Sequence, residues 1–235
     1  MRNKYIVLLG ILLALSISLF GCRGDGGGDS SAPPSPPLIE ALLFSFPIGS
    51  IPLANFENAM AIVTDSSSGA NITTATVVMN GVTLTYNASP THQAYEGNVT
   101  VMPGGSVTLS VTVEGNTYTA SGNQFTIYPS ISSPVSGATF TANSSNTVTW
   151  SAGAPLTSAV YLLGVLDATD PMGGTAYFQG LGTNVNSFSI PANSLTAGSR
   201  VVIVGIATTV SIPNAATDSA LVFGGFNYVP ITVNP

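Results

Sequence analysis

Residues 74–87 read Thr-Ala-Thr-Val-Val-Met-Asn-Gly-Val-Thr-Leu-Thr-Tyr-Asn, and this stretch sets the fold class. Asn80-Gly81 favours the left-handed backbone of a two-residue hairpin turn, and the runs on both sides of it are rich in Thr and Val. The stretch therefore predicts two antiparallel strands, 74–79 and 82–87. Similar short segments, bounded by Gly, Pro and Asn, recur along the chain, so the protein is predicted to be all-β.

The region from residue 55 to residue 128 is predicted to form a first β-sandwich, because turn signals about every 8–12 residues are typical of that fold. Its strands are expected at 59–64, 74–79, 82–87, 95–101, 106–114, 117–120 and 125–128. The apolar segment 38–53 precedes them, and Pro47 and Pro52 exclude a continuous helix there. Two interpretations of this segment stay open: an edge strand with a connector packed on the first sandwich, or a hydrophobic docking segment.

A second set of strands follows the segment 129–134, whose two prolines mark a domain boundary. These strands are expected at 138–142, 147–151, 160–166, 175–179, 187–190, 201–209 and 221–233. The run Val201–Val210 is apolar and uncharged. A central strand of the second sandwich explains this run, and sheet-to-sheet assembly is the alternative.

Two stretches of the second half carry a family resemblance. Residues 133–140 (Ser-Pro-Val-Ser-Gly-Ala-Thr-Phe), followed by Val148-Thr149-Trp150, resemble the opening of bacterial immunoglobulin-like and fibronectin-like modules. Residues 187–198 resemble the late hairpin of the same modules. The resemblance implies a core around Trp150 without a disulfide. The predicted fold is therefore two tandem antiparallel, immunoglobulin-like β-sandwiches, residues 38–128 and 129–235.

The first 22 residues carry a targeting signal. Arg2 and Lys4 precede the apolar run 5–20, which is shorter than the roughly 20 residues of a membrane-spanning helix. Leu19-Phe20-Gly21-Cys22 resembles the lipobox of bacterial lipoproteins. That resemblance implies removal of a signal peptide, residues 1–21, and attachment of palmitate and other acyl chains at Cys22. Plain secretion and a transmembrane anchor are the alternatives.

Residues 22–37 are predicted to be a tether, flexible and Gly-rich at first and stiffer where proline is frequent. In enterobacterial lipoproteins an aspartate after the lipidated cysteine retains the protein in the inner membrane. Arg23 stands at that position, which favours the outer membrane or the cell surface.

Charge excludes several kinds of partner. After removal of residues 1–21, two basic and ten acidic residues remain, so the formal charge falls from −6 to −8. Nucleic acid is excluded as a partner, because no set of cations is available to replace counterions on phosphates. A basic patch for anionic lipid headgroups is excluded for the same reason. Membrane contact is therefore expected through the lipid at Cys22 alone.

The sequence offers little chemistry for catalysis, and the protein is predicted not to be an enzyme. His92 is the single histidine, it lies in a predicted loop, and no G-x-S-x-G nucleophile motif occurs. Zinc is not expected with one histidine and one cysteine, and no cofactor is expected. Asp167 and Asp170 are the one close carboxylate pair. A turn, a calcium site and a catalytic pair are the three interpretations, and Asp167 and Asp170 are kept as the calcium candidate.

Aromatic residues could contact sugars. Tyr177 and Phe178 are neighbours on a predicted strand, so their side chains point to opposite faces. Tyr177 is the candidate for binding if Phe178 points inward. The functional prediction is a lipid-anchored cell-envelope protein with a non-catalytic binding or adhesion role towards protein or polysaccharide. The alternatives are a structural subunit or scaffold of an envelope complex, and an accessory module for polysaccharide processing.

Overall fold

The computed structural model describes residues 35–46, 57–89, 92–151, 159–169, 177–182 and 184–235. Within these ranges the backbone forms strands, turns and loops, which confirms the all-β prediction. The described part of the chain includes no helix with the length and apolarity to cross a membrane. The predicted signal peptide, Cys22 and the tether up to residue 34 lie outside the described ranges.

The strands follow one another along the chain with short turns between most of them. They are β1 (Leu38–Ser45), β2 (Ala59–Thr64), β3 (Thr76–Met79), β4 (Val82–Thr83), β5 (Thr85–Asn87), β6 (Ala94–Gly97), β7 (Ser106–Val113), β8 (Asn116–Asn123), β9 (Ser130–Ser133), β10 (Ala138–Thr141), β11 (Asn146–Ser151), β12 (Val160–Asp167), β13 (Tyr177–Leu181), β14 (Ser187–Ile190), β15 (Gly198–Ser211) and β16 (Ala220–Asn234).

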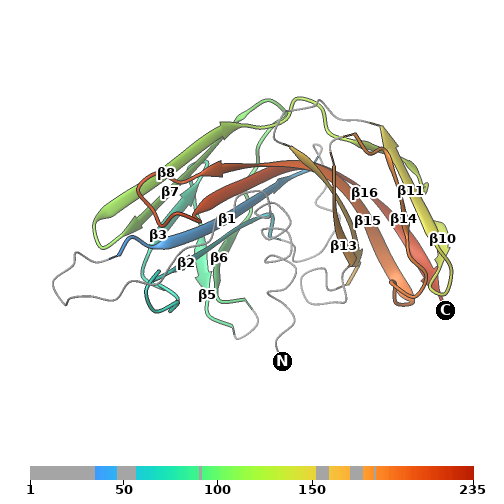
Figure 1. Ribbon diagram of the computed structural model, residues 1–235, viewed down its shortest axis with the longest axis horizontal. Helices are drawn as coiled ribbons and strands as arrows, with labels where there is room; N and C mark the ends of the chain where they lie inside the picture. Colours follow the sequence, from blue (N-terminus) through green and yellow to red (C-terminus); the bar gives the residue numbers. More distant parts are fainter. Residues whose placement is uncertain (1–34, 47–56, 90–91, 152–158, 170–176, 183) are drawn as a thin grey trace.

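These strands form one large sheet and two small ones. The large sheet has nine strands in the order β13-β12-β15-β16-β1-β2-β6-β5, with β10 also paired to β16. A four-stranded sheet, β4-β3-β7-β8, and a three-stranded sheet, β14-β11-β9, pack on the same face of it. Figure 1 shows the long hairpin β15–β16 running through both halves of an arched molecule. The pairs are antiparallel, except that β1 and β10 run parallel to β16.

Strand β16 supplies side chains to two separate cores. Leu221 and Phe223 pack in the first core, between the nine-stranded and four-stranded sheets. Ile231 and Val233 pack in the second core, between the nine-stranded and three-stranded sheets. Side chains two residues apart share one face of a strand, so a single strand can cross both cores. The two predicted sandwiches therefore share the β15–β16 hairpin, a connection that the predicted division after residue 128 did not include.

The nine-stranded sheet is apolar on its other face as well. Leu42, Val201, Ile203 and Phe226 belong to a third cluster of buried residues on that face. A strand with apolar side chains on both faces reads as a continuous hydrophobic run. This explains the sequence Val201–Val210, and β15 lies between β12 and β16 as the central-strand prediction requires.

The connection between the halves crosses β16 at its middle. Gln124 is buried, and its Nε2 donates to Ser45 Oγ (2.9 Å) and to the Gly224 carbonyl oxygen (3.2 Å). The Tyr128 ring then lies over Gly225, where a Cβ would be 2.1 Å from the ring. The side chain of Asn227 donates to the Pro129 carbonyl oxygen (2.6 Å). Residues 125–128, predicted as a strand, form this crossover instead.

Residues 38–45 also differ from both interpretations of the segment 38–53. Strand β1 is neither an edge strand nor an exposed docking segment, because it lies between β16 and β2. Its side chains are buried on both faces: Ile39 and Leu43 in the first core, Leu42 and Phe44 in the third cluster. An inner strand between two partners is where such a run is stable. The rest of the segment, from residue 47, lies outside the described ranges.

Candidate functional site

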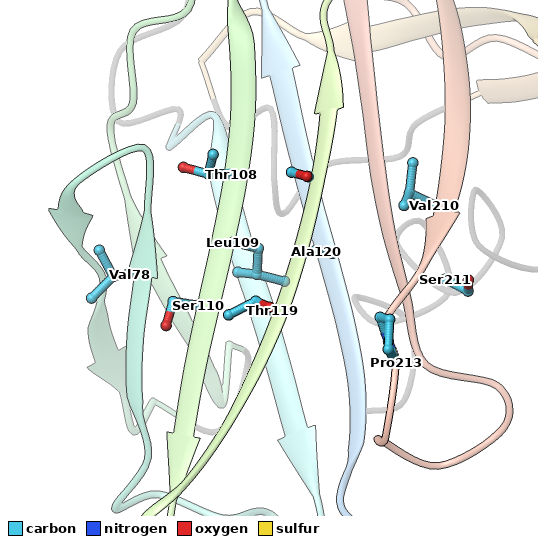
Figure 2. A pocket seen from close by; sticks show the side chains of 10 residues that line it. Val78, Thr108, Leu109, Ser110, Thr119, Ala120, Val210, Ser211 and Pro213 are labelled. Carbon is cyan, nitrogen blue, oxygen red and sulfur yellow. The ribbon is translucent and has the colours of Figure 1, made fainter.

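A groove runs along β8 on the outer side of the first sandwich, with a volume of about 560 Å³. We call it the β8 groove. Figure 2 shows β8 passing between β7 on one side and Val210, Ser211 and Pro213 on the other. Those three residues lie at the end of β15 and in the turn after it. The tip of the C-terminal hairpin therefore forms one wall of a groove whose floor belongs to the first half of the chain.

Alternation along β7 explains why the floor is polar. Val107, Leu109 and Val111 are at most 2% exposed and point into the first core, so the residues between them point outward. Strand pairing then aligns Ser110 with Val78 on one side and with Thr119 on the other. The outward faces of three strands thus form one surface.

Hydroxyl groups dominate the chemistry of the β8 groove. They belong to Thr108, Ser110, Thr119, Ser121 and Ser211. Among the described residues that line the groove, no side chain carries a charge. Hydroxyls both donate and accept hydrogen bonds, which suits a neutral polar ligand. They do not titrate near neutral pH, so this lining offers no general acid or base.

A separate cluster gathers around His92. The buried carboxylate of Glu96 is 2.6 Å from His92 Nδ1 and accepts a hydrogen bond from Asn87 Nδ2 (2.9 Å). Burial raises the pKa of nearby Glu57, and the Glu96 charge raises it further, whereas His92 acts in the opposite direction. His92, which lies in a predicted loop, is thus held by a buried carboxylate. The cluster is separate from the β8 groove, and it joins strands β5 and β6 to the loop between them.

The predicted calcium candidate Asp167 is engaged by a cation of the chain itself. Its Oδ2 pairs with Nη1 of Arg200, which lies directly across the sheet on β15 and is 6% exposed. Its Oδ1 accepts hydrogen bonds from the backbone and hydroxyl of Thr169. Arg200 also donates to Thr196 and Ala197. A calcium ion at Asp167 would therefore compete with a buried guanidinium.

The second calcium candidate, Asp170, lies outside the described ranges, so the calcium site stays a prediction. Within those ranges no group of three or more His, Cys, Asp or Glu residues is placed to hold a metal ion. Asp65, another loop carboxylate, binds its own turn instead. Four hydrogen bonds from Ser67 and Ser68 lower its pKa to about 2.

Tyr177 and Phe178 lie on opposite faces of β13, as alternation predicts. Tyr177 is half-buried and packs against the second core, whereas Phe178 packs against the third cluster. Burial raises the pKa of the Tyr177 phenol. Sugar contact at Tyr177 stays a prediction, and its ring has the second core as its main neighbour.

The β8 groove was missed by sequence reasoning for a definite reason. The outward hydroxyls of residues 106–113 and 116–123 can be read from the alternation of Ser and Thr with apolar residues. The wall formed by residues 210–213 lies about ninety positions after β8 in the sequence, and the shared hairpin brings it to β8. Nothing in the local pattern predicts that approach.

Comparison with known proteins gives distant structural similarity. No protein-family model and no curated protein matches the chain. The fibronectin(III)-like modules of Clostridium thermocellum CbhA share 11% identity, with 84% of this chain and 94% of that chain covered and a TM-score of 0.27. Domains 4 and 5 of the S-layer protein SbsC share 10% identity, with 84% and 98% covered and a TM-score of 0.22.

A third solved structure is a protein bound to sugar. It is the SGBP-B protein of the mixed-linkage glucan utilization locus of Bacteroides ovatus, in complex with a mixed-linkage heptasaccharide. It shares 17% identity, with 81% of this chain and 43% of that chain covered and a TM-score of 0.21. TM-scores this low do not define the fold. The fold is instead described by the strand pairing of the chain itself, an arched nine-stranded sheet that carries two smaller sheets.

Proposed function

We propose that this protein is a lipid-anchored, non-catalytic binding protein of the cell envelope, which holds a protein or polysaccharide partner in the β8 groove. One observation carries the proposal: a groove of about 560 Å³ is lined by hydroxyl and apolar groups, and no described lining residue is charged. Its volume lies in the range of roughly 300–1,000 Å³ common for ligand sites. Such a lining can bind a neutral partner but supplies no acid–base pair.

The anchor part of the proposal rests on the sequence Leu19-Phe20-Gly21-Cys22. Incorporation of a palmitate analogue in cells is expected for the wild type and not for Cys22→Ser. Proteinase K treatment of intact cells, with a periplasmic control protein, then separates surface exposure from a periplasmic position. Labelling of the Cys22→Ser variant at the wild-type level would contradict lipid attachment at this residue.

Site-specific cross-linking tests the groove. A photoreactive phenylalanine analogue is placed at Thr119 in the groove, or at Thr147 on the outer face of the three-stranded sheet. Thr147 is a matched control, because it too is an exposed hydroxyl residue in a strand. Illumination of cells is expected to give an adduct from position 119 and none from position 147. No adduct at 119, or equal adducts at both positions, would overturn the proposed site.

The non-catalytic part has its own test. A saturable hydrolytic activity of the purified protein that His92→Ala abolishes would overturn it, since His92 is the single histidine of the chain.

A structural subunit of an envelope complex is the second candidate function. The position of β8 at the end of its sheet favours it, because edge strands pair readily with other chains.

A further inference from the structure

We propose that the β8 groove binds an uncharged, extended segment of a partner polypeptide, which adds to the free edge of β8 as a further β-strand. The inference rests on the proposed function of the groove and names the class of partner. Its basis is the direction of the backbone groups along β8, which the register of the β7–β8 hairpin fixes.

The turn between β7 and β8 sets that register. Glu114 and Gly115 have φ values of 48° and 80°, as a two-residue type I′ turn requires. Val113 and Asn116, which flank the turn, therefore exchange backbone hydrogen bonds with each other. In an antiparallel pair every second residue of a strand bonds to its neighbour. Tyr118 thus bonds to β7, as do residues 120 and 122.

The far end of the hairpin confirms this alternation. Gln124 N–H donates to the Gly105 carbonyl oxygen at 2.8 Å, which is the position that the alternation from Asn116 predicts. The backbone N–H and C=O groups of Thr117, Thr119 and Ser121 consequently point away from β7. No hydrogen bond of the described residues uses these groups.

The sequence of β8 itself lacks the features that protect many edge strands from pairing. Edge strands are commonly protected by lysine, proline, a β-bulge or a short length. Strand β8 reads Asn-Thr-Tyr-Thr-Ala-Ser-Gly-Asn, and it pairs with β7 over eight residues without a register shift. The free groups lie on the side of β8 away from β7, where Figure 2 shows Val210, Ser211 and Pro213, and two of the three residues, Thr119 and Ser121, line the groove. A strand placed there would find regularly spaced donors and acceptors.

The lining also selects the kind of strand. The described lining residues carry no charge, in a chain whose formal charge is −6, so a charged segment would lose hydration without gaining a counter-charge. None of the described lining residues is aromatic. Proteins commonly bind sugars by stacking them on aromatic rings, and this lining offers no such ring. A neutral polypeptide with small or β-branched side chains therefore fits better than a polysaccharide.

Amide hydrogen exchange of the full-length protein in detergent micelles tests the inference. The probe is the capped octapeptide Ser-Val-Thr-Leu-Ser-Val-Thr-Val, which copies β7 and so has the alternation that β8 already accepts. In the free protein, the amides of Thr117, Thr119 and Ser121 are expected to exchange quickly. Saturating peptide is expected to protect these three and to leave the already slow amides of Tyr118 and Ala120 unchanged.

Two substitutions at one position separate backbone pairing from hydroxyl binding. Thr119→Pro removes a free N–H but no bond to β7, because proline is tolerated where the N–H of an edge strand faces outward. We expect it to weaken peptide binding at least about tenfold, since a tenfold loss corresponds to one lost interaction of about 1.4 kcal/mol. Thr119→Val keeps the N–H and removes the hydroxyl, and we expect it to weaken peptide binding less than Thr119→Pro does.

The remaining outcomes are decisive against the inference. The inference is overturned if Thr119→Pro binds the peptide as tightly as the wild type does. It is also overturned if bound peptide leaves the amides of Thr117, Thr119 and Ser121 unprotected. Cellohexaose, a neutral oligosaccharide, serves as the second probe. Cellohexaose could bind to the wild type but not to Thr119→Val, and leave the edge amides unprotected. In that case the strand inference fails while the proposed function of the groove stands. Absence of the cross-link at position 119 removes both.

Discussion

Gly205 determines how the aromatic cluster packs at the middle of the long hairpin. The Phe226 ring lies directly over it, so that a Cβ at position 205 would be 2.0 Å from a ring carbon. Phe226 is 1% exposed and contacts the Phe44 ring at a centroid distance of 4.4 Å. A ring that is enclosed in this way cannot move aside without disturbing its neighbours.

We therefore expect Gly205→Ala to lower the free energy of unfolding by about 1–3 kcal/mol, the usual cost of overpacking a core. Gly182→Ala is the control, because its Cβ would meet no atom within 4 Å. That substitution should change stability by less than about 1 kcal/mol. Urea denaturation of both variants measures the difference. Equal midpoints for the wild type and Gly205→Ala would show that Phe226 relaxes freely.

Glu40 gives the protein a stability that depends on pH. Burial raises the pKa of this carboxyl, and the charge of Asp218 raises it further. The folded state therefore holds the Glu40 proton more tightly than the unfolded chain, in which the pKa of this carboxyl is 4.5. The stabilisation that results is fully present below pH 4.5 and is lost as the pH rises through the raised pKa.

The substitution Glu40→Gln should remove this loss. We expect a higher urea midpoint than the wild type at pH 7 and an equal midpoint at pH 3.5, where both side chains are neutral. Asp218→Asn should shift the pH 7 midpoint in the same direction by less, because it removes the smaller of the two causes. A lower midpoint of Glu40→Gln at pH 7 would contradict the assigned sign.

At the scale of elements, the crossover at residues 124–129 fixes the two halves of the molecule to each other. Gln124 is 2% exposed and serves three groups: Ser45 Oγ, the Gly224 carbonyl and the Phe125 N–H. Gln124→Leu would leave these buried groups without their partner. We expect a loss of about 1–3 kcal/mol in the free energy of unfolding, the cost of unsatisfied buried polar groups.

Gln179→Leu is the matched control for that substitution. Gln179 is half-buried and donates to the carbonyl of its own neighbour, Gly180, so its loss should cost less than about 1 kcal/mol. Chemical denaturation followed by fluorescence of Trp150 reports on both variants. Equal losses for the two variants would mean that the crossover does not depend on the Gln124 hydrogen bonds.

The same elements show how far the sequence predicts the fold. Strand β2 was predicted with its observed ends, because apolar residues fill it and a polar loop closes it. Residues 82–87 were predicted as one strand but form β4 and β5 in different sheets, and Leu84 between them is buried in the first core. Alternation reports which face is buried, and it does not report which sheet covers that face.

The partner of each strand is the part that local patterns leave open. Residues 38–45 are apolar enough for an inner strand, yet their parallel partner is β16, about 180 positions away in the chain. The β8 groove has the same origin, because its far wall comes from the tip of that distant hairpin. The sequence therefore predicts most strands but not which strands lie beside one another. A site formed where two such neighbours meet could not be predicted.

At the scale of the whole molecule, the shared hairpin makes the first half depend on the second. Strand β1 loses its parallel partner without residues 220–225, and the first core loses Ile212, Leu221 and Phe223. The predicted domain 38–128 contains none of these. A sandwich that exposes one side of an inner strand and a gap in its core has little reason to fold.

We expect a fragment of residues 35–128 to be unfolded, with a circular dichroism spectrum and amide proton shifts typical of a random coil. The chain 35–235 should instead unfold in one transition, with equal calorimetric and van't Hoff enthalpies, because β15 and β16 couple both cores. Adding a synthetic peptide of residues 198–235 to the fragment should restore part of the β-sheet signal, since it returns β16 to β1. A stably folded 35–128 fragment would show instead that the first sandwich is complete without the hairpin and that the division after residue 128 is a true domain boundary.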